Sequence, residues 1–223
     1  MRFSLTLLLL LLLSCSYSFS QEVQGTQHVV ELVGKYKEIN IDNDTRVIKI
    51  LIDNGNADQS KIIDSVEQSP NKYIPPVLYV LSYVLFNSGK KPEAAYWFYL
   101  AQLRARYDVN RCTDKTANAS SYNQNFGPAI NEYATKDLDS LQVLIDKVVS
   151  FERSNEETYD QRWINLTGMN AMMAGLGDKK KTNDNQLSLP KEQWADIKKK
   201  TIDDYLDGFK EALDMLRKKR QSK

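Results

Sequence analysis

Apolar residues recur every three or four positions through most of this chain, and this spacing constrains the fold more than any other feature of the sequence. In the clearest case, residues 138–151, one helix face is made by Leu138, Leu141, Leu144, Ile145, Val148 and Val149. Thr135 and Asp137 precede this run, and each is a residue type that caps helix N-termini, so either is expected to begin the helix. A chain patterned in this way folds as helices that each bury one stripe.

Similar runs, each bounded by cap residues, proline or glycine, predict helices over residues 44–53, 58–68, 75–87, 92–107, 160–175 and 190–219. Met169, Met172 and Met173 are expected in the core. Residues 108–134 are rich in Asn, Ser and Thr and are expected to form a long polar connection. The sequence therefore predicts an all-α fold, an irregular bundle of six or seven helices. The β-branched stretch 28–33 leaves a short N-terminal strand as an alternative to a first helix.

One helical hairpin, residues 78–107, resembles a single tetratricopeptide or Sel1-type unit. The residues that carry the resemblance are Leu78, Tyr79, Leu81, Tyr83, Gly89, the run 93–98 (EAAYWF) and Ala101. No second copy follows at the period of about 34 residues that such arrays need, so a solenoid is not expected. The resemblance implies a local α-hairpin and a lean toward protein binding.

The first twenty residues have the anatomy of a signal peptide. Arg2 is followed by an apolar run from Leu5 to Leu13, which is too short to span a membrane, and then by a polar stretch with small residues at Ser18 and Ser20. We expect cleavage before Gln21 and a single helical domain over residues 21–223, without an integral membrane segment. The expected location is the periplasm or the exterior. The alternative is an outer-membrane lipoprotein anchored at Cys15, because residues 12–15 (LLSC) resemble a lipobox.

Composition excludes several classes of function. The formal net charge is +1, so the chain has no bulk positive field for nucleic acid. His28 is the single histidine, and processing at either site leaves Cys112 without an intramolecular partner, so we expect this thiol to be buried. The sequence lacks the glycine-rich phosphate-binding loops and the His/Cys zinc pattern. No cofactor or metal is therefore expected.

The segment 102–112 carries the densest set of functional side chains. Arg104, Asp108 and Arg111 are three or four residues apart and share one face of a continuing helix. Two interpretations stay open: the arginines clamp an acidic partner loop, or an Arg104–Asp108 pair anchors the polar stretch that follows. The candidate binding residues are Tyr96, Tyr99, Arg104, Arg106 and Arg111.

These observations favour an exported protein-binding module over an enzyme. One form of this hypothesis is a protein that neutralises a toxin or hydrolase acting in the cell envelope. The first alternative is a carboxylate-dependent hydrolase of cell-wall glycans, which needs two facing acids of different pKa. Its candidate acids are Asp137, Asp139, Glu152, Glu156, Glu157 and Asp160. The second alternative is a structural envelope lipoprotein.

Overall fold

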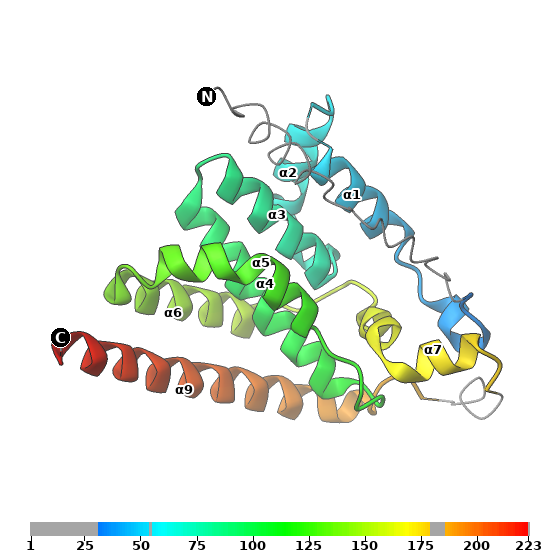
Figure 1. Ribbon diagram of the computed structural model, residues 1–223. Coiled ribbons are helices and arrows are strands. Elements are labelled where there is room, and N and C mark those ends of the chain that lie inside the picture. Colours follow the sequence, from blue (N-terminus) through cyan, green and yellow to red (C-terminus); the bar gives the residue numbers. More distant parts are fainter. Residues whose placement is uncertain (1–30, 54, 179–185, 223) are drawn as a thin grey trace, which may run out of the picture.

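The computed structural model describes residues 31–53, 55–178 and 186–222, and over this part of the chain the fold is all-α, as predicted (Figure 1). The α-helices are α1 (Asp42–Ile52), α2 (Gln59–Gln68), α3 (Pro75–Asn87), α4 (Lys91–Arg111), α5 (Ser120–Ala134), α6 (Leu138–Ser154), α7 (Met169–Gly175) and α9 (Trp194–Gln221). Short 3-10 turns are η1 (Gly34–Glu38), η2 (Pro70–Lys72), η3 (Gln161–Thr167) and η4 (Lys191–Gln193). The only β-type pairing among these residues is a bridge between Cys112 and Ser188.

The expected hairpin of α3 and α4 forms the centre of the molecule. Two prolines start α3, and Gly89, at φ +86°, makes the turn into α4. Both helices are buried on several sides. The packing of α5, α6 and α9 around α4 places that helix at the heart of the core.

Helix α6 begins where the sequence predicted. The Asp137 side chain caps it by accepting hydrogen bonds from the backbone N–H groups of Asp139 (3.1 Å) and Ser140 (3.0 Å). Helix α9 runs along one side of the molecule, against both α4 and α6 (Figure 1). Its buried residues Ile202, Tyr205 and Leu213 join the same core.

The expected polar connection over residues 108–134 is wrong, because most of it is helical. Helix α4 continues to Arg111, and α5 occupies Ser120–Ala134 with Pro128 in its interior. Tyr122 and Phe126 of α5 stack on Tyr79, with ring centroids 5.4 and 6.0 Å apart. Aromatic stacking on α3 therefore stabilises a helix whose sequence is otherwise polar.

The helix predicted over 160–175 is divided by Gly168 into η3 and α7. A Cβ at Gly168 would lie 2.8 Å from Cγ of Asp114, so only glycine fits beside that buried carboxylate. The core position expected for Met169, Met172 and Met173 is also wrong, because these side chains are 49%, 39% and 39% exposed. Cys112 is buried, as expected.

The N-terminal predictions fall mostly outside the described residues. The signal peptide and residues 28–30 of the alternative strand lie outside them, and residues 31–33 form no regular element. Within the described ranges, no helix is both long enough and apolar enough to cross a bilayer.

Candidate functional site

The five predicted binding residues all lie on α4, but they do not share one surface. Arg104 and Arg111 are 0% and 3% exposed, and Tyr99 is 2% exposed. Tyr96 is half-buried, and Arg106 is exposed. The prediction that all five form one contact surface is therefore wrong, since three of them face the interior of the folded chain.

Arg104 is the centre of a buried ion cluster. Its Nε donates to Oε2 of Glu152 on α6 at 2.9 Å, and its Nη1 donates to the carbonyl oxygen of Pro70 at 2.9 Å. Its Nη2 donates to the side-chain oxygen of Asn71. These bonds use the planar fork of the guanidinium to join α4, α6 and η2. The role of Arg104 is thus to cross-link the core.

Arg111, and not Arg104, is the partner of Asp108, which corrects the expected pair. Asp108 Oδ1 accepts from Arg111 Nε at 3.0 Å, while Oδ2 accepts from the Tyr159 hydroxyl at 2.9 Å and from the Trp163 indole at 2.6 Å. Complete burial raises the pKa of Asp108 to about 6, against the opposing effects of Arg111 and these hydrogen bonds. Asp108 therefore ties α4 to the segment that leads into η3.

A second carboxylate lies beside Glu152. Glu157 accepts a 2.8 Å hydrogen bond from Lys198 of α9, and the same ammonium lies 3.6 Å from Oε1 of Glu152. Lys198 also donates to the Asn155 carbonyl oxygen at 2.6 Å. Burial raises the pKa of Glu152. Burial opposes the shift of Glu157, but its interactions with Glu152 and with the Lys198 ammonium lower its pKa.

A hollow of about 540 Å³ opens next to this cluster. Its lining comprises Arg111, Glu157, Thr158, Tyr159, Asp160, Gln161, Arg162, Lys191 and Trp194. Hydrogen bonds from neighbouring groups lower the pKa of both of its acids, Glu157 and Asp160, although burial opposes both shifts. Glu152, whose pKa is raised, is 0% exposed and does not line the hollow. A hydrolase needs a proton-donating acid that substrate can reach and whose pKa is raised, and neither acid of this hollow has a raised pKa.

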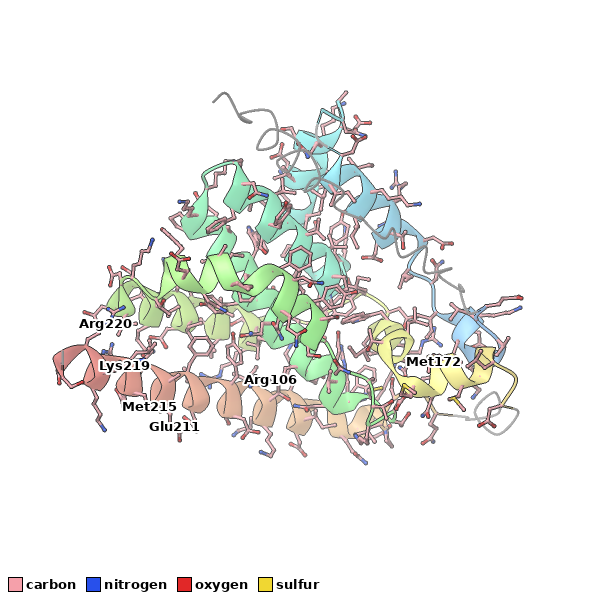
Figure 2. The ribbon with its side chains drawn as sticks, in the orientation of Figure 1. Arg106, Met172, Glu211, Met215, Lys219 and Arg220 are labelled. Atoms are coloured by element: carbon pink, nitrogen blue, oxygen red, sulfur yellow. The ribbon has the colours of Figure 1, made fainter. Side chains whose placement is uncertain are left out.

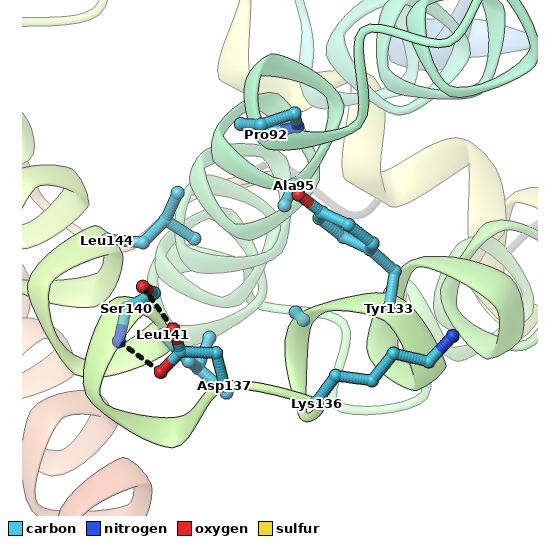
Figure 3. A pocket seen from close by; sticks show the side chains of 9 residues that line it. Pro92, Ala95, Tyr133, Lys136, Asp137, Ser140, Leu141 and Leu144 are labelled. Atoms are coloured by element: carbon cyan, nitrogen blue, oxygen red, sulfur yellow. Dashed lines mark hydrogen bonds between the residues drawn. The ribbon is translucent and has the colours of Figure 1, made fainter.

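Another hollow, of about 210 Å³, lies where α4 and α6 begin and α5 ends (Figure 3). Its floor is apolar, with Ala95, Leu141 and Leu144 among its lining residues. Asp137 lines it too, but both of its oxygens are engaged at the start of α6. Lys136 extends away from it in Figure 3. This hollow therefore offers few polar groups to orient a ligand.

The exposed Arg106 lines a different hollow, of about 230 Å³, between α4 and α9. Its other lining residues are Tyr205, Gly208, Phe209 and Ala212. The Arg106 guanidinium carbon lies 5.3 Å from the centre of the Tyr205 ring. Figure 2 shows Arg106 beside α9, with Glu211 and Met215 further along that helix. Arg106 forms no ion pair and no hydrogen bond with the residues that the structure describes.

Sequence reasoning missed Lys198 and did not connect Glu152 with Arg104. Lys198 stands in a run of three lysines that has the pattern of a solvated helix face. Glu152 follows the apolar stripe of α6, and its contact with Arg104 joins residues 48 positions apart. One signal was present: Glu152 lies four residues after Val148 and so continues the buried face of the helix.

Within the described ranges, no group of three or more His, Cys, Asp or Glu side chains is placed to hold a metal ion. No protein-family model, curated protein or solved structure matches this chain, and the hairpin resemblance therefore rests on its own residues.

Proposed function

We propose that this chain is an exported protein-binding module whose partner docks on the face formed by α4 and α9 around Arg106. The observation that carries the proposal is an exposed arginine that has no carboxylate partner among the described residues and lies beside a hollow of aromatic and small residues. Arginine is one of the residues on which protein interfaces most often depend. Export is the part of the proposal that rests on residues 1–20.

Gly208 supports the proposal that a partner approaches the α9 backbone closely at this face. It lies in the interior of α9, where glycine costs about 1 kcal/mol relative to alanine. A Cβ at this position would meet no atom within 4 Å, so packing within the chain does not require glycine. Ala212 and the 65% exposed Met215 follow at helical spacing on the same side of α9. A partner helix or strand can therefore approach the backbone of α9 here.

The charges of this face favour a partner that brings a carboxylate. Two nearby acids of α9 already have cationic neighbours on the same helix: Lys200 contacts Asp204 at 2.7 Å, and Lys210 lies 3.8 Å from Asp207. Arg106 is left to pair with an outside anion, and its stacking on Tyr205 holds the guanidinium in place. Neutralisation of an acidic enzyme or toxin in the same compartment is one form of this function.

The test is comparative affinity capture with the mature chain, residues 21–223, as bait. Bait carrying Arg106→Glu or Gly208→Gln should lose a partner that the unchanged chain retains, because one change reverses the charge and the other fills the approach. Binding of the purified partner should weaken by about tenfold or more, since a charge-assisted contact contributes about 1.5–3 kcal/mol.

Lys147→Glu is the matched control, because it makes the same change of charge at an exposed position of α6. It should bind as the unchanged chain does. A partner held equally by all four baits would place the interface elsewhere. Capture of no saturable partner by the unchanged bait would contradict the proposed function itself.

A further inference from the structure

We propose that Glu152 and Glu157 share one proton, and that this proton keeps the segment after α6, residues 155–157, packed against α9. We call this arrangement the latch. Glu152 is completely buried, Glu157 is partly buried, and both lie against the Lys198 ammonium, so two ionised carboxylates are unfavourable here. The latch is independent of the α4–α9 binding face. It would make the packing of this region sensitive to pH.

The first argument comes from an unsatisfied oxygen. Glu152 Oε2 accepts the hydrogen bond from Arg104, but Oε1 has no hydrogen-bond partner among the described residues. Lys198 stays at 3.6 Å from Oε1, close enough for an ion pair and too far for a hydrogen bond. A buried carboxylate oxygen without a donor costs several kcal/mol. A proton on Oε1 removes this cost, because the resulting hydroxyl can donate to Glu157.

The second argument comes from the charges that face the pair. Glu152 is approached by Arg104 from α4 and by Lys198 from α9, and Tyr96 of α4 lies within electrostatic range of it. Glu157 lies near Lys198 from α9 and, more remotely, Arg111 and Tyr107 from α4. Arg111 has Asp108 as its own partner.

Lys198 joins the carboxylate pair to residues 155–157. Its ammonium holds Glu157 and the Asn155 carbonyl oxygen at the same time, at 2.8 and 2.6 Å. Further along, the Thr158 backbone N–H and side-chain hydroxyl both donate to the Asn71 carbonyl oxygen. Loss of the proton places a second negative charge opposite Glu157. We therefore expect release of residues 155–157 and the first turns of α9, with Thr158 still anchored.

The direction of the pH effect follows from the two shifts. Burial raises the pKa of Glu152 from its ordinary value of 4.5 to about 8. The stability that this group contributes is therefore present below pH 4.5 and is lost as the pH rises from 4.5 to about 8. Glu157, whose pKa is lowered to about 2, adds stability that is lost as pH falls from 4.5 toward 2. The pair thus favours the closed state in mildly acidic solution.

The experiment is hydrogen exchange of the full chain between pH 6 and pH 10, corrected for the intrinsic rate. In the unchanged protein, the opening of residues 155–157 and 195–202 should increase by up to about tenfold per pH unit as the pH rises toward the pKa of Glu152, because opening releases one proton there, and it should level off above that pKa. In Glu152→Gln this dependence should vanish, because the amide donates to Glu157 without titrating. Glu156→Gln, an exposed neighbour, is the matched control and should behave as the unchanged protein.

Equal pH dependence in the unchanged protein and in Glu152→Gln would overturn the latch, as would pH-independent protection in the unchanged protein. If Glu152→Gln does not fold, infrared spectroscopy of the unchanged protein decides the question. A protonated glutamic acid band should be present at neutral pH and disappear in alkaline solution. Its absence at neutral pH would overturn the shared proton.

Discussion

Arg104 and Arg106 lie two positions apart on the same helix and have opposite surroundings. Arg104 is completely buried and forms bonds with Glu152, Pro70 and Asn71. Arg106 is exposed, stacks on one ring and has no carboxylate partner among the described residues. Two positions on a helix amount to more than half a turn, so neighbouring arginines face different environments. The same residue type can therefore stabilise the core at one position and remain available for binding at the other.

The largest effect that separates the two arginines is expected on stability. Arg104→Met should lower the free energy of unfolding by about 3–5 kcal/mol, because it leaves a buried carboxylate and two buried acceptors without their donor. Arg106→Met should cost less than about 1 kcal/mol, the value of an exposed cation–π contact. Urea unfolding at neutral pH measures both. Equal losses for the two variants would end the distinction between them.

A smaller effect is expected at the other end of the buried cluster. Asp108→Asn keeps the shape of the side chain but removes the charge that Arg111 faces. We expect a loss of about 1.5–3 kcal/mol in the free energy of unfolding, the contribution of a hydrogen bond to a charged group. Asp207→Asn on the exposed side of α9, where the ion pair with Lys210 is 3.8 Å long, should change it by no more than about 1 kcal/mol. Thermal and urea unfolding of both variants provide the check.

The sequence predicted only part of which residues are buried and which are exposed. Helices with strong apolar spacing and clear ends, such as α6 and the α3–α4 hairpin, were predicted close to their observed bounds. Helix α5 was not, because only Gly127 and Ile130 of it are buried and its hold on α3 comes from Tyr122 and Phe126 stacking on Tyr79. A ring stack between residues more than 40 positions apart has no local pattern.

The candidate site shows the same limit. The sequence identified Arg104, Asp108 and Arg111 as one helix face, which is correct as geometry. One of its two open interpretations paired Asp108 with Arg104, since spacings of three and four residues are both allowed on a helix. In the structure Arg104 instead donates a hydrogen bond to Glu152, which lies 48 positions away in the sequence. Local spacing thus identified which residues matter, while long-range contacts decided what each one does.

The smallest expected effect concerns the two glycines that lie inside long helices and meet different surroundings. A Cβ at Gly127 of α5 would lie 3.1 Å from the Phe98 ring, whereas at Gly208 of α9 it would meet nothing within 4 Å. Gly208→Ala should therefore raise the free energy of unfolding by up to about 1 kcal/mol, the difference in helix propensity. Gly127→Ala should bring no such gain, because the Phe98 ring has to shift.

Urea unfolding of the two alanine variants measures this difference directly. If Gly208→Ala raises the free energy of unfolding and Gly127→Ala does not, the glycine of α9 does not serve the stability of the chain. Folding would then leave that position free to serve contact with a partner, as the α4–α9 face requires. If Gly208→Ala were instead destabilising, the glycine would have an internal role, and the argument for close approach at α9 would lose its main support.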